Sequence, residues 1–300
     1  IRLTEGLFLV WIFFKLRILF VHASLVLILT GSLQALIGIV EFIFQRVPGS
    51  TLLGMAYHSP EILGDQVVEG VFGRLLRSYG TLDHPNILGG FLIFCLILVC
   101  ALLPLAKERF QKMFLLASGS MLTMGMFFTF SRAAWLAFAV LILAQWFHFH
   151  SRSSIRSAFL AFLGIFLILA LSSFPVFKTR IQGESRLEQK SFSERATYQA
   201  DAFKIIKKNW PTGIGIGNIS VVTGNQPVHN VYLVIFAELG IFGLLFFLYM
   251  LGSFLPRSDI SLWGPFFILT FFDHYFFTLH FGVLLFWLTF ALFVEVRNKS

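Results

Sequence analysis

Charged residues are scarce in this sequence, in which Asp, Glu, Lys and Arg together make up only 13% of 300 residues. Soluble domains carry about a quarter charged residues, so the composition excludes a water-soluble globular protein. Cysteine is scarcer still. Cys95 and Cys100 lie inside one apolar run, which argues against a disulfide bond and offers no metal-ligand spacing. Apolar residues, at 57% of the chain with 39 Phe, and a mean hydropathy of +0.82 indicate an integral membrane protein.

Runs without Asp, Glu, Lys or Arg predict the membrane-spanning helices, because a span needs roughly 20 apolar residues. Such runs cover residues 87–106, 113–131, 133–151, 157–177 and 239–256. An earlier span, about 18–44, is interrupted by polar residues, and residues 260–294 predict two short helices that meet at Asp273 and His274. Residues 1–14 resemble the end of a further span, and we expect the chain to be a fragment that lacks N-terminal helices. The predicted fold is an all-α, polytopic transmembrane helical bundle of about eight spans plus a partial first one, in a single membrane domain over residues 1–300.

The short connections that carry Lys and Arg all fall on one side of this predicted topology, at 15–17, 107–112, 152–156, 257 and 297–299. Short basic loops face the cytoplasm. The alternate connections are therefore predicted to lie outside, at 43–86, 131–132, 178–228 and 273–280. The extracytoplasmic loop 178–228 is itself basic, and its cations suit either anionic lipid headgroups or a site for an anionic, phosphate-bearing substrate.

Residues 191–210 of this loop predict an amphipathic helix that lies on the outer membrane surface. Ser191 and Glu194 have the spacing of a capping box, which marks the start of a helix. An apolar stripe follows at positions 198, 202, 205 and 206. This start places Arg195 in the first turn, where helix N-termini attract anions and a guanidinium can bind phosphate through two hydrogen bonds.

Other polar side chains gather at the predicted outer ends of the spans. His84 and Asn86 lie in the segment Gly80-Thr-Leu-Asp-His-Pro-Asn86, just before a span. Arg132 occupies a tight turn between two spans, and His229 with Asn230 opens a long apolar helix. Polar groups placed by chance would scatter over both faces of the membrane, so this grouping favours a functional site.

Each candidate also has a structural interpretation. Glu238 lies about 13 Å into the helix that follows His229; an intramembrane carboxylate is a functional candidate, or it forms a hydrogen bond to a neighbouring helix. Taken alone, Arg132 fits a snorkelling interfacial residue and His229 fits an interfacial anchor. Asp273 and His274 mark one more outer turn.

Several motifs resemble the bacterial O-antigen ligase and O-antigen polymerase superfamily over about residues 20–296. They are Thr129-Phe-Ser-Arg-Ala-Ala-Trp135, Glu194-Arg195 with Asn209-Trp-Pro-Thr-Gly-Ile-Gly215, and His229-Asn-Val-Tyr-Leu with Ala237-Glu-Leu-Gly240, and Gly80 to Asn86 is similar to a family element before a span. The resemblance implies a glycosyltransferase at the outer, periplasmic face of the bacterial inner membrane. Its donor would be glycan on undecaprenyl pyrophosphate, and its acceptor lipid A-core in a ligase or another lipid-linked repeat in a polymerase. No metal, other cofactor or nucleic-acid partner is expected.

By position, Arg132 and Arg195 match the pyrophosphate-binding arginines of that superfamily, and His229 matches its essential histidine. Two arginines would stabilise the charge that accumulates on the leaving pyrophosphate, and a neutral histidine could orient or deprotonate the acceptor hydroxyl. Asn230 would hold the imidazole or the helix end. The remaining predicted substrate-binding residues are Glu194, His84, Asn86, Glu238, Asp273 and His274.

The acceptor stays open at this point, because the turn Phe272-Asp-His-Tyr-Phe-Phe-Thr278 is similar to uncharacterised relatives more than to characterised ligases. Ligase and polymerase are therefore both retained. The alternative from another class is a transporter of lipid-linked glycans, which would place ionisable groups near the membrane midplane and show two related halves. Here most spans lack charge and no internal repeat is visible, so the enzyme is favoured.

Overall fold

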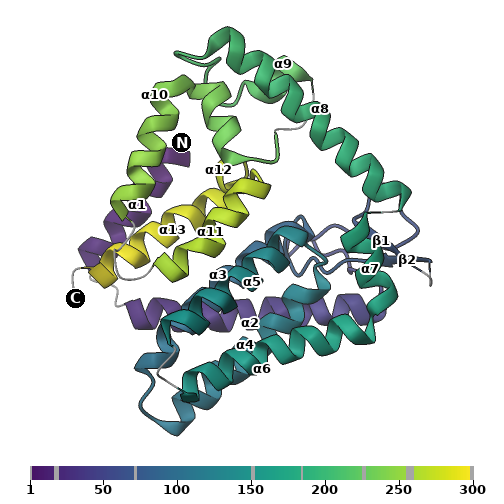
Figure 1. Cartoon of the computed structure of the whole chain (residues 1–300), viewed down its shortest axis with the longest axis vertical. Helices are drawn as coiled ribbons and strands as arrows, with labels where there is room; N and C mark the ends of the chain where they lie inside the picture. The colour runs from purple at the N-terminus through teal and green to yellow at the C-terminus, as the bar shows by residue number, and fades with distance from the viewer. Residues whose placement is uncertain are drawn as a thin grey trace. The chain divides into compact units, whose positions relative to one another are not determined.

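The computed structural model describes residues 2–16, 20–70, 73–149, 153–183, 185–224, 228–254 and 260–297. Helices dominate these residues (Figure 1). Within them, four helices are long and apolar enough to cross a membrane, over 20–44, 85–105, 155–172 and 231–252. The predicted all-α membrane fold is confirmed, whereas the predicted count of about eight spans is not. The predicted basic residues Arg17, Arg152, Arg257 and Lys299 lie outside the described residues.

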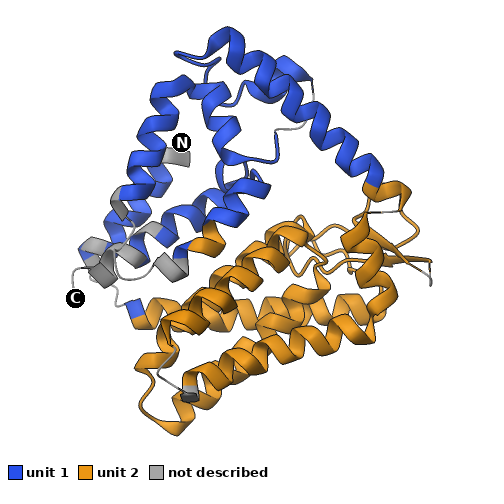
Figure 2. Cartoon of the chain, in the orientation of Figure 1, with its two compact units in different colours: residues 1–20, 189–263, 267–300 blue, residues 21–188, 264–266 orange. Residues whose placement is uncertain are grey.

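The contacts divide the chain into two compact units (Figure 2). Unit 1 comprises residues 1–20, 189–263 and 267–300, and unit 2 comprises residues 21–188 and 264–266. The predicted single membrane domain and extracytoplasmic loop 178–228 stay predictions. The loop's residues belong to both units, with the division after Glu188.

Unit 2 contains most of the regular structure that precedes residue 189. Its elements are α2 (Phe20–Phe44), β1 (Val67–Gly70), β2 (Gly73–Leu76), α3 (Pro85–Leu102), η1 (Leu103–Leu105), α4 (Arg109–Phe128), α5 (Arg132–His148), α6 (Ser153–Ser172) and α7 (Phe174–Gln182). Helix α3 is almost entirely buried and contacts α4 and α5. Small residues permit this close packing: a Cβ atom on Gly89 of α3 would lie 3.0 Å from the Cβ of Ala134 on α5.

Polar groups of α2 hold the segment that leads into α3. The Glu41 carboxylate accepts hydrogen bonds from the backbone N–H groups of Tyr79 (2.9 Å) and Gly80 (2.8 Å), and the Gln34 side chain accepts one from Thr81 (2.8 Å). Buried backbone N–H groups need such partners. The polar residues that interrupt the predicted span 18–44 therefore fix the loop between β2 and α3.

The hairpin of β1 and β2 is antiparallel, with Val67 opposite Leu76. Val67 and Leu76 form a small buried cluster with Val47 and Tyr79, so the hairpin packs on the same loop. Helix α7 contacts β1. The loop between α2 and α3 is thereby ordered around Arg77, which directly follows β2.

Unit 1 contains α1 (Arg2–Leu16), most of α8 (Arg186–Asn209), α9 (Ile219–Thr223), α10 (Val231–Phe254), most of α11 (Ile260–Phe272), α12 (Tyr275–Thr278) and α13 (His280–Arg297). Helix α10 is interrupted at Gly240, whose φ of +68° and ψ of −167° are not helical. The interruption leaves the carbonyls of Ala237 and Glu238 to accept hydrogen bonds from the N–H groups of Ile214 (3.0 Å) and Gly215 (2.8 Å). The segment after α8 is therefore tied to α10 through its backbone.

Two sequence-based expectations for α8 are wrong. The helix begins at Arg186 rather than Ser191. The prediction failed because residues with the spacing of a capping box also occur inside helices, where they cap nothing. Arg195 consequently lies in the third turn, and the argument that the helix N-terminus helps it bind anions does not hold.

The apolar stripe of α8 also faces protein rather than the membrane surface. Ala202 and Ile206 are buried in one cluster with residues of α9 and α10, and Tyr198 and Ile205 pack against it. A different set of apolar side chains on or next to α8 is exposed, namely Phe192, Phe203 and Trp210. The predicted stripe therefore belongs to the core of unit 1.

Candidate functional site

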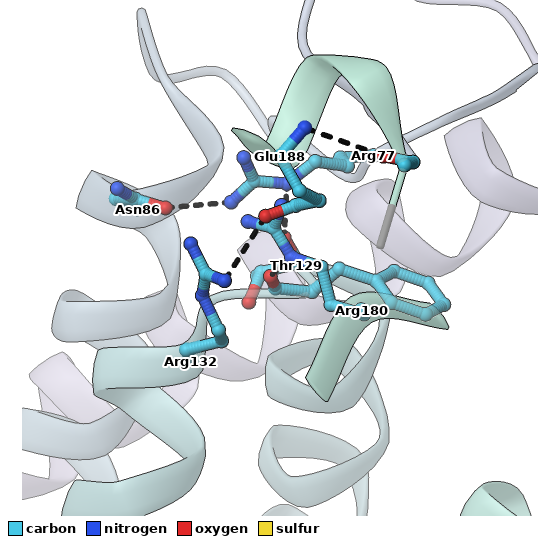
Figure 3. A network of polar contacts seen from close by, with 8 residues as sticks. Arg77, Asn86, Thr129, Arg132, Arg180 and Glu188 are labelled. Atoms are coloured by element: carbon cyan, nitrogen blue, oxygen red, sulfur yellow. Dashed lines mark hydrogen bonds and ion pairs between the residues drawn. The ribbon is translucent and has the colours of Figure 1, made fainter. Parts of the chain in front are cut away.

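The turn between α4 and α5 organises a cluster of arginines in unit 2 (Figure 3). The carbonyls at the end of a helix have no partner within the helix. Here the Nε group of Arg77 donates to the Thr129 carbonyl (2.7 Å), and the Nε group of Arg180 donates to the Phe130 carbonyl (2.8 Å). Phe130 has a φ of +47°, a left-handed conformation that is uncommon for a bulky residue. Two arginines from distant segments thus stabilise a strained turn.

Arg132 follows this turn as the first residue of α5, after the N-cap Ser131, whose hydroxyl accepts a hydrogen bond from the Ala134 N–H (3.4 Å). Its Nη1 atom forms an ion pair with Oε2 of Glu188 (3.0 Å). Arg180 forms an ion pair with the other carboxylate oxygen of Glu188. One buried carboxylate therefore lies between two arginines from different helices.

Arg77 completes the cluster from the loop after β2. It is 3% exposed, and its Nη2 group donates to the side-chain oxygen of Asn86 (2.6 Å). Asn86 lies in the first turn of α3, where the N-cap His84 accepts a hydrogen bond from its backbone N–H (3.0 Å). The three arginines and Glu188 together carry a formal charge of +2.

A second polar cluster lies in unit 1 at the start of α10. The Nδ1 atom of His229 lies 3.3 Å from Oδ1 of Asp273, and the ring centres of His229 and His274 are 4.9 Å apart. Asp273 follows α11 and also accepts a hydrogen bond from the His274 backbone N–H (2.9 Å). Asn230 accepts a hydrogen bond from the Leu233 N–H (2.9 Å). Asn230 was predicted to hold either the imidazole or the helix end, and this hydrogen bond holds the helix end.

His274 is kept neutral at neutral pH by its surroundings. Burial lowers its pKa from 6.5 to about 4, and the charges of His229 and Arg195 act in the same direction, whereas Asp273 opposes the shift. Its Nδ1 atom lies 2.5 Å from the Thr278 hydroxyl, which fixes the ring. Arg195 belongs to the same unit as the histidine pair, and its positive charge contributes to lowering the pKa of His274.

His229, Asp273 and His274 each offer a donor atom, and these atoms lie within 4.8 Å of one another. Imidazole nitrogens and a carboxylate oxygen are ligands of divalent transition metals. The three residues could therefore hold such an ion with a modest rearrangement. The family resemblance expects no metal, and the same residues also fit proton transfer.

The other predicted site residues have local structural partners. Glu238 is 2% exposed, and its carboxylate accepts a hydrogen bond from the Ile219 N–H (3.3 Å), which ties α9 to α10. Glu194 forms an exposed ion pair with Lys190 (3.8 Å). Roles for Glu238, Glu194 and His84 in substrate binding stay predictions.

The structure brings His229, Asp273 and His274 together, and it brings Asn86 to the arginine cluster of Arg132. Each cluster lies within one unit, so the predicted cavity shared by Arg132 and His229 stays a prediction. Sequence reasoning missed Arg77, Arg180 and Glu188. The only available signal was the presence of an acidic residue eight positions after Arg180 in a basic loop.

Residues 116–248 match a family model described as O-Antigen ligase. No curated protein and no solved structure gives a significant match. The matched range includes Arg132, Arg180, Glu188, Arg195 and His229. Over this range, the predicted resemblance to the O-antigen ligase-like superfamily is confirmed. The superfamily comprises membrane glycosyltransferases of ligase and polymerase type that use lipid-linked glycan and a glycan acceptor.

Proposed function

We propose, with the O-antigen ligase match over residues 116–248 as the premise, that this protein transfers glycan from an undecaprenyl-pyrophosphate donor to an acceptor hydroxyl. The reaction would take place at the outer face of the bacterial inner membrane. The observation that carries the proposal is the contact between His229 and Asp273 at the start of α10. A histidine oriented by a carboxylate is suited to remove a proton from a hydroxyl group.

The orientation of His229 follows from the chemistry of its partner. An ionised Asp273 only accepts hydrogen bonds, so it favours the tautomer with the proton on Nδ1 of His229. Nε2 then keeps its lone pair and is the atom that accepts the acceptor's proton. The acceptor oxygen forms a bond to the anomeric carbon of the donor sugar, while the bond from that carbon to the pyrophosphate oxygen breaks. The leaving pyrophosphate takes the bonding electron pair.

The leaving group needs positive charge rather than a proton donor, because pyrophosphate is already a stable anion. Arg132 and Arg195 match the family's arginines by position, and we assign them to this charge. Contacts to developing charge are strong in a site from which water is partly excluded. Arg132 adds the bidentate geometry that a guanidinium offers to phosphate oxygens.

Reconstitution of the chain in nanodiscs with lipid-linked glycan and candidate acceptors tests the proposal, with mass analysis of the products. Glycan on lipid A-core identifies a ligase, and lengthened lipid-linked glycan identifies a polymerase. The variant His229→Ala should form neither product. His280→Ala removes an exposed histidine of the same unit and serves as the matched control. Full turnover by His229→Ala would contradict the assignment of this histidine.

A further inference from the structure

The Glu188 carboxylate lies where an anionic ligand of the arginines would lie. Its two oxygens form separate ion pairs, one with Arg132 and the other with Arg180. Figure 3 shows the carboxylate between these two side chains, with Arg77 beside them. Carboxylates and phosphates present a similar edge of two oxygens to guanidinium groups. Glu188 therefore occupies the position that suits a phosphate group.

We propose that Arg77, Arg132 and Arg180 form a phosphate-binding site, and that Glu188 is its resident anion, which the phosphate of a ligand replaces. The site adds Arg77 and Arg180 to Arg132, and all three belong to unit 2. Only the identity of the phosphate's carrier, the lipid-linked donor, rests on the proposed function. Phosphate binding by the cluster follows from its geometry and charge.

Two of the three arginine side chains are held in place without Glu188, and the third begins the helix that follows the same turn. Arg77 and Arg180 use their Nε groups on the carbonyls of Thr129 and Phe130, and Arg132 is fixed at the start of α5. Each Nε contact fixes the plane of a guanidinium group and so directs its Nη atoms. Because the backbone of one turn positions the cluster, departure of the carboxylate does not disperse it.

Charge complementarity favours the exchange. Buried charges are costly unless they are paired, and Glu188 offers one negative charge to both Arg132 and Arg180. A pyrophosphate diester carries a negative charge on each phosphate, so it neutralises the arginines more completely than Glu188 does. The side chain of Arg132 is 24% exposed, compared with 10% for Arg180 and 6% for Glu188. A ligand would therefore reach the site past Arg132.

Glu188 has a position to which it can move. It lies in the first turn of α8, and its N–H donates to the hydroxyl of Ser185 (3.3 Å). Acidic side chains are stabilised in the first turn of a helix by the helix dipole. A released carboxylate would keep this favourable interaction. Exchange then requires a side-chain movement and local adjustment of the first turn rather than unfolding of α8.

Removal of the Glu188 charge tests the proposal, because the affinity for pyrophosphate should rise if Glu188 competes with the ligand and fall if Glu188 organises the arginines. An internal competitor lowers the apparent affinity of a ligand in proportion to the fraction of competent sites. Glu188→Gln should therefore bind inorganic pyrophosphate about tenfold more tightly than the natural chain, measured by calorimetry in nanodiscs of neutral lipid. Glu61→Gln removes the charge of an exposed glutamate in the same unit and should leave the affinity unchanged. Weaker binding by Glu188→Gln would mean that Glu188 organises the arginines, and would overturn the exchange.

Hydrogen exchange on the natural chain gives a result that does not depend on how a variant folds. Addition of pyrophosphate should increase amide exchange over residues 186–190 and decrease it over residues 129–132. Unchanged or slower exchange over 186–190 with bound pyrophosphate would overturn the proposal.

Two further arms identify the carrier of the phosphate. The lipid-linked donor and phosphatidylglycerol nanodiscs are each tested as competitors of pyrophosphate. Competition by phosphatidylglycerol alone would assign the site to a lipid headgroup. Tighter pyrophosphate binding by Glu188→Gln without any glycan transfer would remove the proposed function and keep the site. Glycan transfer by the natural chain, with the same pyrophosphate affinity in Glu188→Gln, would keep the proposed function and remove the exchange at Glu188.

Discussion

The arginine cluster of unit 2 and the histidine cluster of unit 1 differ in how their charge responds to pH. Arg77, Arg132 and Arg180 keep their charge at every physiological pH. Histidine is the side-chain type whose charge changes most readily near neutrality, and burial keeps His274 of the second cluster neutral down to about pH 4. The permanent charges suit the binding of an anion, and the titratable ring suits the movement of a proton.

The two clusters are also built differently. The arginines come from three segments: Arg77 and Arg180 are anchored on backbone carbonyls of one turn, and Arg132 is the first residue of the helix that follows it. The histidines depend on a side-chain contact between the start of α10 and the end of α11, 44 residues apart in the chain. A substitution in the second cluster should therefore alter chemistry without altering anion binding. The following predictions test that division, beginning with the largest expected effect.

Removal of the imidazole should separate turnover from donor binding most clearly. His229→Ala should lower the rate of glycan transfer by about 10²–10⁴-fold, the usual contribution of a general base, with nearly unchanged donor affinity. Arg132→Ala should lower the rate by about 10²–10³-fold and weaken donor binding as well. Arg132→Lys should recover only part of the loss, because one ammonium group does not reproduce the fork of a guanidinium. Donor affinity and turnover are measured for each variant in nanodiscs.

Arg195 sharpens this comparison, since it lies in unit 1, its charge acts on the pKa of His274, and yet it matches a pyrophosphate-binding arginine by position. If it contacts pyrophosphate, Arg195→Ala weakens donor affinity as Arg132→Ala does. A variant with natural donor affinity and lower turnover would instead assign Arg195 to the histidine cluster. Equal donor affinity in all of these variants would exclude a pyrophosphate contact by either arginine.

Asp273 is expected to act through His229, and its loss should have a smaller effect. Asp273→Asn replaces an acceptor by a group that can also donate, which removes the preference for the Nδ1-protonated tautomer. Turnover should fall by about 10²-fold, the low end of the usual contribution of a general base, while the donor KM stays the same. Asp273→Glu should recover part of the rate, because it restores the carboxylate. A raised donor KM with unchanged kcat would contradict the positioning role.

The sequence predicted the parts of the fold that depend on apolar length. Charge-free runs located α3 (Pro85–Leu102), α4 (Arg109–Phe128) and α5 (Arg132–His148) to within a few residues, because burial of such runs leaves helices as the stable choice. The start of α8 was misplaced, since Ser191 and Glu194 fit a capping pattern that local sequence cannot distinguish from mid-helix residues. The break at Gly240 was missed because the N–H groups that compensate for it, those of Ile214 and Gly215, lie more than twenty residues earlier in the chain.

Site residues were predicted where a polar residue stands out against an apolar helix. They were missed where only a contact with a distant residue shows their role. His229, Asp273 and His274 are polar residues at the ends of apolar helices, and the structure brings them together. Arg180 and Glu188 looked like ordinary charges of a basic loop. Only the tertiary structure shows that Glu188 pairs with both Arg180 and Arg132, because the sequence does not indicate which arginine forms an ion pair with a given glutamate.

The smallest expected effect concerns stability and the neutrality of His274. An unfolded histidine binds a proton below about pH 6.5, whereas burial delays protonation of His274 in the folded chain to about pH 4. Between these values the unfolded state binds more protons, so the free energy of unfolding should fall as the pH is lowered. The total loss for such a shift is about 3 kcal/mol, and above pH 6.5 this group should contribute no pH dependence.

Comparison with His274→Gln isolates that contribution, because carboxylates and other histidines titrate in both proteins. The natural chain in nanodiscs should lose more thermal stability than His274→Gln between pH 6.5 and pH 4, and the two should show parallel behaviour between pH 6.5 and pH 8. His280→Gln removes a side chain that is 60% exposed and should retain the natural slope. If His274→Gln keeps the same slope as the natural chain, then His274 has the same pKa in the folded and the unfolded chain. Burial would then not keep His274 neutral below pH 6.5, and this part of the contrast with the arginine cluster would fail.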